Sequence, residues 1–195
     1  MSLGPLSHGW IFIDKPKGIT SFDVIRKVRA FTKIKKIGHS GTLDPFATGV
    51  LALAFGEATK SIQFLSSIKE YDFEITFGEK RDTDDVTGNI IESNDVYPSL
   101  NIINNCIKTF IGTIDQVPPH YSAVKVEGQR AYKLARKGKT FELGSKKVEI
   151  FKFQCLTKTA DNIYSLRVKC SSGTYIRSLA RDIAEKLGCF AYVSS

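Results

Sequence analysis

Residues 162–188, "NIYSLRVKCSSGTYIRSLARDIAEKLG", contain the change of pattern that indicates the fold. In the first part of this stretch every second side chain is apolar, which predicts a strand with one buried face. The apolar residues of that face are Tyr164, Leu166, Val168 and Cys170. After Gly173 the apolar spacing lengthens to that of a helix. The side chains expected to face inward from this helix are Ile176, Leu179, Ile183 and Leu187.

A second strand is predicted directly upstream, in "KKVEIFKFQCL" at 146–156, and the two strands could form a hairpin. Further strands are predicted at 10–14, 49–56 and 71–77, and helices at 21–31, after Gly56 and at 99–112. In the helix at 21–31 we expect one inward side made of Phe22, Ile25, Val28 and Phe31. Strands and helices that interleave in this way favour a mixed α/β or α+β sheet with helices packed against it.

The charge of the chain is unevenly distributed. Its 195 residues carry a net charge of +8, and their number suits one large domain. Residues 1–70 hold ten Lys/Arg against five Asp/Glu, residues 71–120 hold three against nine, and residues 121–195 hold fifteen against six. Two basic segments around an acidic one indicate a polyanionic partner, with nucleic acid the first candidate. A solvated basic face is the alternative.

The ends and the cysteines exclude several classes of protein. Residues 1–8 carry no pattern and are expected to be unstructured or a cloning remnant, and no export signal is recognisable there. The longest apolar run, 50–55, is too short to span a bilayer. Four cysteines without a C-x-x-C pair, with three scattered histidines, indicate neutral thiols in a reducing cytoplasm rather than a zinc site.

The loop "GHSGTLDPFATG" at 38–49 could present the carboxylate of Asp44. Pro45 keeps the residue before it out of the helical region, so Asp44 must be extended or in a turn. Glycines on both sides permit sharp backbone turns. For an isolated Leu-Asp-Pro, however, an ordinary Asx-turn at a loop tip is the more common structure.

Three other side chains are candidates with plain alternatives. If Thr174 caps the last helix, Arg177 occupies the third helical position, where the helix dipole disfavours a cation. An arginine directed at a carboxylate or phosphate would explain this placement better than an exposed one. Tyr71 could be a core tyrosine or could stack on a base, and His39 could be a simple loop histidine.

Seven segments occur together in one order: "KPKGITS" (15–21), "GHSGTLDPFATGVL" (38–51), "GEATK" (56–60), "KEYDFEITFG" (69–78), "RDTDDVTG" (81–88), "PPHYSAVKVEGQRAYKLARKG" (118–138) and "CSSGTYIRSLARDIAEKLG" (170–188). In this order and spacing the chain resembles the TruB family, the bacterial tRNA pseudouridine-55 synthases. The resemblance extends over nearly the whole chain from Trp10 onward.

The resemblance implies roles for the candidate residues. Asp44 matches the family's catalytic aspartate, which attacks either the uracil ring or the ribose. Arg177 matches the arginine that pairs with that aspartate, and Tyr71 matches the tyrosine that stacks on the target base and takes part in proton handling. Tyr175 matches a further tyrosine of the base pocket. His39 matches the histidine that displaces the target nucleotide from the T-loop.

Supporting residues follow from the same resemblance. Lys15 and Pro16 match a motif that supports the catalytic loop and contributes to the substrate site. The basic stretch 125–139, which begins with Lys125, is predicted to be helical and to grip the RNA backbone, as an insertion does in this family. A solvated helix is the alternative for this stretch.

The implied fold is α+β: a pseudouridine-synthase-like, mixed but largely antiparallel sheet flanked by helices, with the basic RNA-gripping insertion. We expect one catalytic domain over residues 9–195, and family members continue beyond this point with a PUA-like domain. The expected partner is the T-arm stem-loop of tRNA, with no membrane, metal or cofactor, for a monomer in the cytoplasm.

Three rival interpretations are open. The guide-RNA-dependent eukaryotic and archaeal relative shares a similar aspartate loop. A non-catalytic RNA-binding domain could have kept the fold. A small-molecule enzyme with an anionic substrate is weakened because no phosphate-loop or cofactor motif is present.

Overall fold

The computed structural model describes residues 7–65 and 67–195. The chain divides between Ser67 and Ile68 into two compact units, which we call the N-terminal unit and the C-terminal unit. Each has its own sheet and its own apolar interior. Of the segment predicted to be unstructured, residues 1–6 lie outside the described residues. Ser7 and His8 directly precede the first strand.

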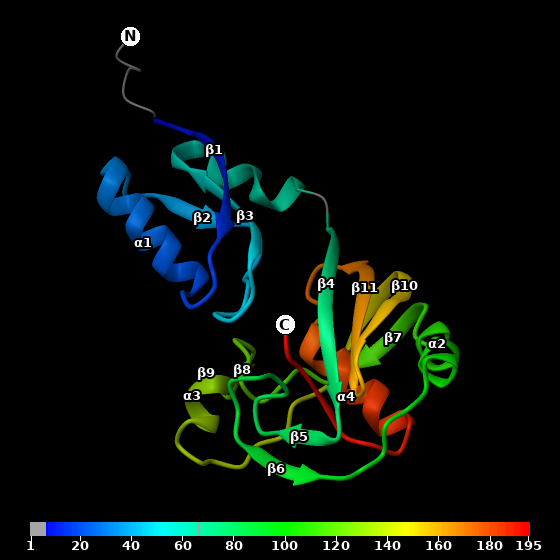
Figure 1. Ribbon diagram of the computed structural model, residues 1–195. Coiled ribbons are helices and arrows are strands. Elements are labelled where there is room, and N and C mark those ends of the chain that lie inside the picture. Colours follow the sequence, from blue (N-terminus) through cyan, green and yellow to red (C-terminus); the bar gives the residue numbers. More distant parts are fainter. Residues whose placement is uncertain (1–6, 66) are drawn as a thin grey trace. The chain divides into compact units, whose positions relative to one another are not determined.

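The N-terminal unit is a three-stranded antiparallel sheet in the order β1-β3-β2 (Figure 1). Its strands are β1 (Gly9–Lys15), β2 (Ile37–His39) and β3 (Gly49–Phe55), followed by the 3₁₀ helix η1 (Gly56–Phe64). One helix, α1 (Ser21–Thr32), packs on the sheet. The core residues are Val24, Ile25, Leu51 and Leu53. The strands at 10–14 and 49–56 are therefore confirmed.

Helix α1 begins as predicted but turns a different face inward. Thr20 and Asp23 form a reciprocal capping box at its start. Phe22 and Phe31, expected inside, are 62% and 90% exposed, whereas Val24 joins Ile25 in the core. The expected stripe was wrong because residues three apart lag by about 60° per step at 3.6 residues per turn. Over three such steps Phe22 and Phe31 lie on opposite sides of the helix.

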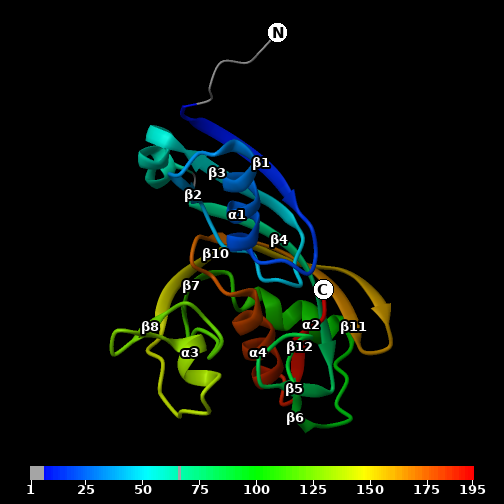
Figure 2. The same ribbon diagram turned by 90° about the vertical axis from the view of Figure 1, so that its left-hand side faces the viewer.

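The C-terminal unit contains a five-stranded sheet in the order β12-β4-β11-β10-β7 (Figures 1 and 2). Its strands are β4 (Ile68–Phe77), β7 (Gly112–Gln116), β10 (Lys146–Ala160), β11 (Ile163–Ser171) and β12 (Ala191–Val193). The predicted hairpin is β10–β11, and every strand pair of this sheet is antiparallel. A single isolated bridge, Asp85 to Val193, is parallel.

Two helices pack on one face of this sheet: α2 (Leu100–Lys108) and α4 (Ile176–Lys186) (Figure 2). The sheet residues buried on that face include Phe73, Ile75, Phe77, Leu166 and Val168. Burial of alternate residues in β11 confirms the period-2 pattern read from the sequence. In β4 the pattern holds up to Ile75, after which Thr76 is buried together with Phe77. In α4, Leu179 and Ile183 are fully buried, whereas Ile176 and Leu187 are only half-buried.

The acidic segment and the basic segment of this unit each contain a small hairpin. Strands β5 (Glu79–Arg81) and β6 (Ile90–Ser93) flank the acidic loop. The basic stretch is a two-residue hairpin of β8 (Lys125–Val126) and β9 (Gln129–Arg130), followed by the short helix α3 (Ala131–Ala135).

The expected helix over 125–139 is therefore wrong in its first half. Both turn residues, Glu127 and Gly128, have positive φ (48° and 80°). This is the geometry of a type I′ hairpin turn, which a helix cannot contain. Lys125 consequently lies on a strand of this hairpin, where it is exposed.

Candidate functional site

The candidate residues lie in two clusters, one in each unit. In the N-terminal unit, Asp44 lies in the loop between β2 and β3. The side chain is half-buried, and the Ala47 N–H donates to the Asp44 carbonyl at 3.1 Å. This is a tight turn directly after the Asp-Pro step, as the sequence predicted.

The loop is attached on both sides of Asp44. Before it, the Ser21 hydroxyl donates to the Leu43 carbonyl at 3.1 Å and accepts from the Leu43 N–H at 3.0 Å. After it, the Pro45 carbonyl accepts from the Gly18 N–H at 2.7 Å. The start of α1 and the turn before it therefore hold the backbone of the loop, so that the carboxylate is presented from a fixed position.

Lys15 completes this attachment. It is fully buried, and its Nζ donates to the carbonyls of Pro16 (3.0 Å), Ile19 (2.8 Å) and Pro45 (3.4 Å). Burial lowers the pKa of the Lys15 ammonium, and the negative charge of Asp44 opposes that change. These are the contacts of a residue that supports the loop. Contact of Lys15 with substrate stays a prediction.

His39 is the last residue of β2 and is half-buried. Its Nδ1 is hydrogen-bonded to the Gly41 carbonyl, two residues further along the same loop. The imidazole is therefore attached to the segment that carries Asp44, and a role in displacing a nucleotide stays a prediction.

In the C-terminal unit, Arg177 is the second residue of α4. The N-cap position of the helix is occupied by Tyr175 rather than by Thr174, and the Thr174 hydroxyl donates to the Ser171 carbonyl at 2.8 Å. The sequence-based position of Arg177 was therefore wrong by one residue. The alternative of an exposed arginine is also wrong, because only 6% of Arg177 is exposed.

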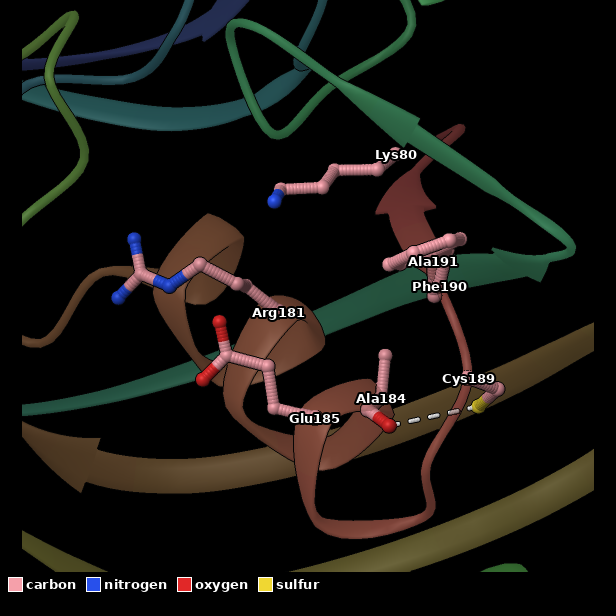
Figure 3. Close-up of a pocket in the computed structure, with 7 residues that line it drawn as sticks. All are labelled: Lys80, Arg181, Ala184, Glu185, Cys189, Phe190 and Ala191. Carbon is pink, nitrogen blue, oxygen red and sulfur yellow. Dashed lines mark hydrogen bonds between the residues drawn. The ribbon is translucent and has the colours of Figure 1, made fainter. Parts of the chain in front are cut away.

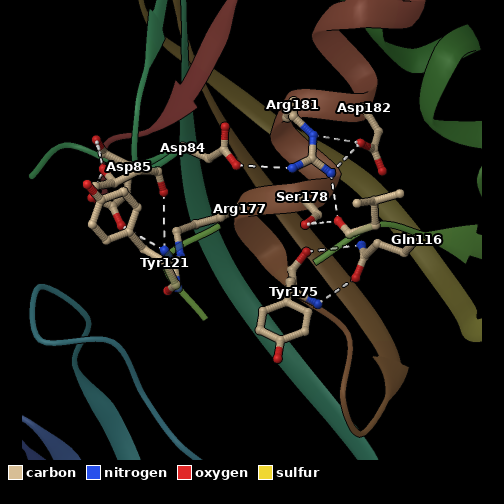
Figure 4. A network of polar contacts seen from close by, with 11 residues as sticks. Asp84, Asp85, Gln116, Tyr121, Tyr175, Arg177, Ser178, Arg181 and Asp182 are labelled. Carbon is tan, nitrogen blue, oxygen red and sulfur yellow. Dashed lines mark hydrogen bonds and ion pairs between the residues drawn. The ribbon is translucent and has the colours of Figure 1, made fainter. Parts of the chain in front are cut away.

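Acidic and carbonyl oxygens surround the Arg177 guanidinium (Figure 4). Nη1 donates to the Thr83 carbonyl at 3.1 Å and lies 3.4 Å from Asp85 Oδ2, and Nη2 donates to the Tyr121 carbonyl at 3.2 Å. Buried charges persist in proteins when they are paired and hydrogen-bonded. The Asp85 partner thus explains how α4 tolerates a buried cation near its positive end.

The two oxygens of the Asp85 carboxylate have different partners. Oδ1 accepts from the Thr83 hydroxyl (2.8 Å) and from both the N–H and the hydroxyl of Thr87 (2.9 and 2.5 Å). Oδ2 faces Arg177. The acidic loop therefore fixes the orientation of its own carboxylate, and that carboxylate in turn orients the guanidinium.

Arg181, one helical turn after Arg177, forms an ion pair with Asp84, the residue before Asp85. Arg181 Nη1 is 3.1 Å from Asp84 Oδ2, its Nη2 donates to the Val117 carbonyl at 2.7 Å, and it also pairs with Asp182 (Figure 4). Asp84 is buried at φ 59°, a left-handed conformation that aspartate tolerates better than most residues. Burial raises the pKa of the Asp84 carboxyl, and the charge of Arg181 opposes the rise.

Tyr175 lies next to this cluster and is half-buried. Both polar groups of its backbone are bound by the side chain of Gln116, and the Lys146 ammonium lies 5.3 Å from the centre of its ring. Tyr71 lies on β4, half-buried on the same face as Phe73. The structure thus brings Arg177 and Tyr175 together at the start of α4.

Asp44 belongs to one unit and Arg177 to the other, so their pairing stays a prediction. Residue patterns alone missed three members of the C-terminal cluster: Asp85, Gln116 and Arg181. The available signal was the pair of adjacent acidic residues in "RDTDDVTG" together with two arginines four residues apart in α4.

A small pocket in the C-terminal unit is too small to be the substrate site. It lies between the end of α4 and β12 and is lined by Lys80, Arg181, Ala184, Glu185, Cys189, Phe190 and Ala191 (Figure 3). Its volume of about 30 Å³ accommodates one or two water molecules. Within 7–65 and 67–195, no cluster of three His, Cys, Asp or Glu side chains could hold a metal ion.

Residues 29–176 match the model of the TruB family pseudouridylate synthases, N-terminal domain. The chain belongs to this family. Among curated relatives, "tRNA pseudouridine synthase B" of Ehrlichia ruminantium (strain Gardel) is 45% identical over 189 residues, covering 96% of this chain and 64% of the relative. The protein of the same name from Paracoccus denitrificans (strain Pd 1222) is 46% identical, covering 96% and 63%. The chain thus spans about three fifths of the length of these relatives.

Solved structures agree with the fold. A chain in "Crystal Structure of a Cbf5-Nop10-Gar1 Complex" superposes with a TM-score of 0.71 at 31% identity, covering 97% of this chain and 47% of that one. A chain in "Structure of H/ACA RNP bound to a substrate RNA containing 2'-deoxyuridine" gives 0.67 at 27% identity. The predicted α+β pseudouridine synthase fold is confirmed. In the part of the chain that the structure describes, no helix is long and apolar enough to cross a membrane.

Proposed function

We propose that this chain is the catalytic domain of an enzyme that converts uridine 55 in the T-loop of tRNA to pseudouridine, with the two units acting as one domain over residues 9–195. The observation that carries the proposal is the attachment of the Asp44 loop. In a chain of the TruB family, the backbone on both sides of Asp44 is bound, at Leu43 by Ser21 and at Pro45 by Gly18. A buried lysine ammonium lies near its carboxylate.

The reaction needs a nucleophile and a proton acceptor but no redox partner. The bond between C1′ of the ribose and N1 of uracil breaks, a bond between C1′ and C5 forms, the C5 proton leaves and N1 gains a proton. We assign the nucleophile to Asp44. A site that excludes water raises the pKa of a carboxyl group, and a nearby cation opposes this rise. Lys15 supplies such a charge, and we propose that Arg177 pairs with Asp44 directly.

The target base must leave the folded T-loop before it can react. Extrusion of a nucleotide costs a few kcal/mol, and stacking on an aromatic ring returns about 1–3 kcal/mol per base. We assign the stacking ring to Tyr71 and a further wall of the base pocket to Tyr175. We propose that His39 fills the space that the base vacates.

The RNA backbone is assigned to the basic hairpin and short helix. Lys125 and Arg130 lie on β8 and β9, and both are exposed. Contacts of this kind position the RNA without reading its sequence, and they weaken as salt concentration rises. We propose the T-arm stem-loop as the ligand of this surface, bound by a cytoplasmic monomer.

The test uses a T-arm stem-loop RNA with tritium at C5 of its uridines and measures the release of tritium to water. We expect the wild type to release tritium from this substrate without any added guide RNA. Release by Asp44→Asn should be at least about 10³-fold slower, because removal of a nucleophile removes its chemical step. Asp14→Asn, at an exposed position of β1, is the matched control. Retained RNA binding without release by the wild type would make this a non-catalytic RNA-binding domain.

A guide-RNA-dependent enzyme is the second candidate. A chain in a Cbf5-Nop10-Gar1 complex and a chain in an H/ACA RNP share the fold, with TM-scores of 0.71 and 0.67. The identity of 42–46% to proteins named tRNA pseudouridine synthase B favours the stand-alone enzyme. The same tritium assay separates the two, since isomerisation that appears only after a guide RNA is added would favour the second.

A further inference from the structure

The start of α4 lacks an ordinary cap. Most helices begin with a Ser, Thr, Asp or Asn whose side chain binds a backbone N–H of the first turn. The N-cap of α4 is Tyr175, which makes no such bond. Arg177 is the second residue of this helix. The segment most sensitive to fraying is therefore the one that carries two residues of the proposed site.

Gln116, at the end of β7, binds this segment instead. Its Oε1 accepts from the Tyr175 N–H at 2.8 Å, and its Nε2 donates to the Tyr175 carbonyl at 3.1 Å. The amide thus binds Tyr175 as a neighbouring strand would bind it. The same carbonyl accepts the first hydrogen bond within the helix, from the Leu179 N–H at 3.1 Å. Gln116 is only 1% exposed, and both halves of its amide are used (Figure 4).

The residue after Gln116 adds two more hydrogen bonds to the same helix. The Val117 carbonyl accepts from the Ser178 hydroxyl at 2.7 Å and from Arg181 Nη2 at 2.7 Å. The backbone of Gln116 itself is paired with Lys146 of β10 in the sheet. Two consecutive residues, Gln116 and Val117, therefore bind the first two turns of α4 to the edge strand of a five-stranded sheet.

We propose that Gln116 is a positioning residue that sets the placement of Arg177 and Tyr175. It acts through the backbone of Tyr175 and does not itself contact the substrate, and this inference rests on the proposed function. When the amide is lost, the contacts of the Val117 carbonyl remain, but Tyr175 at the N-cap loses its link to the sheet. The guanidinium of Arg177 then samples positions away from the reacting carboxylate, and displacements of about 1 Å can slow a reaction by roughly 100-fold.

The test compares the wild type with Gln116→Met, which keeps the length of the side chain and removes both hydrogen bonds. We expect the single-turnover rate constant on T-arm RNA to fall roughly 10- to 100-fold at a temperature where the variant is folded. The dissociation constant for the RNA should change by less than about threefold, because Gln116 makes no contact with it. Amide hydrogen exchange at residues 175–179 should become faster.

Asn162→Ala is the matched control. The Asn162 amide donates to the Phe77 carbonyl at 2.8 Å, so this change also removes a side-chain-to-backbone hydrogen bond of the same unit, away from α4. We expect it to lower the melting temperature while the rate constant stays at the wild-type value. If Gln116→Met does not fold, Gln116→Glu serves instead, because it keeps the acceptor for the Tyr175 N–H and loses the donor to its carbonyl.

The outcomes separate the inference from the function on which it rests. A wild-type rate constant in folded Gln116→Met, with the RNA isomerised normally, overturns the positioning role and leaves the function intact. If the wild type itself does not isomerise uridine, the function fails. The exchange measurement then decides the inference alone, and unchanged exchange at 175–179 overturns it.

Discussion

The Asp44 loop and the Arg177 cluster hold their central residues by different means. In the N-terminal unit the buried charge is Lys15, and three backbone carbonyls surround its ammonium. In the C-terminal unit the buried charge is Arg177, and a full negative charge on Asp85 lies beside it. Three peptide dipoles, with the charge of Asp44, offset the charge of Lys15, whereas a direct ion pair offsets that of Arg177.

The difference determines what each cluster can tolerate. A carbonyl that loses its donor remains a neutral group, and water can replace the donor at modest cost. A carboxylate that loses its arginine in the interior remains an uncompensated charge, which is much more costly. We therefore expect the C-terminal cluster to be the more sensitive to single substitutions.

The largest effect is expected from Arg177→Met. It leaves the Asp85 carboxylate buried without its cation, which typically lowers the free energy of unfolding by about 3–5 kcal/mol, and it should abolish isomerisation. Arg167→Met is the control, because Arg167 makes an exposed ion pair with Asp72 that contributes about 0–1 kcal/mol. Equal losses in urea unfolding for the two variants would contradict the argument.

Lys15→Met should have the next largest effect. It removes three hydrogen bonds at about 1 kcal/mol each, because the Pro16 and Pro45 residues are exposed and water can replace the lost donor there. Hydrogen exchange should rise in the N-terminal unit, around residues 16–19 and 43–45. Lys17→Met, at an exposed lysine of the same turn, is expected to have no measurable effect on unfolding. Unchanged exchange in Lys15→Met would show that the ammonium does not hold the loop.

A steric test addresses the loop that presents Asp85. A Cβ at Gly88 would lie 2.3 Å from Asp82 Oδ1 and 2.9 Å from the Thr83 backbone nitrogen. Gly88→Ala should therefore destabilise the protein by about 1–3 kcal/mol, as overpacking typically does, and should slow isomerisation. At Gly144 a Cβ meets nothing within 4 Å, so Gly144→Ala is the control. Thermal unfolding and the tritium assay measure both variants.

The smallest effect concerns pH and Asp84. Burial raises the pKa of this carboxyl above its usual value of 3.8, so the unfolded state releases the proton first. Stability contributed by the protonated form is present below pH 3.8 and is lost as pH rises through the pKa of the folded state. The side chain that Asp84→Asn introduces cannot ionise. The free energy of unfolding of this variant, relative to wild type, should therefore increase as the pH rises from 3.8 through the pKa of folded Asp84. A difference that is constant between pH 3 and pH 7 would contradict this.

Patterns in the sequence predicted most of the secondary structure, and the failures have local causes. The hairpin β10–β11 and the strand β4 follow from period-2 patterns, which depend only on neighbouring residues. The inward face of α1 and the hairpin at 125–130 were not predicted correctly. Which face of α1 is buried depends on how its side chains pack on the sheet, and spacing alone did not identify that face. The hairpin depends on positive φ at Glu127, which residue type does not indicate.

The sequence alone was sufficient for the family, the antiparallel character of the fold and the turn that presents Asp44, because motif order, alternation and an Asp-Pro step are local properties of the chain. Folding alone decided which side chains meet. Arg177 pairs with Asp85, 92 residues earlier, and Gln116 is hydrogen-bonded to the backbone of Tyr175, 59 residues later. Neither contact follows from a periodic pattern. Contacts of this kind arise when helices and loops dock on a sheet, and a buried charge or amide then takes whichever partner the packing brings within hydrogen-bonding distance.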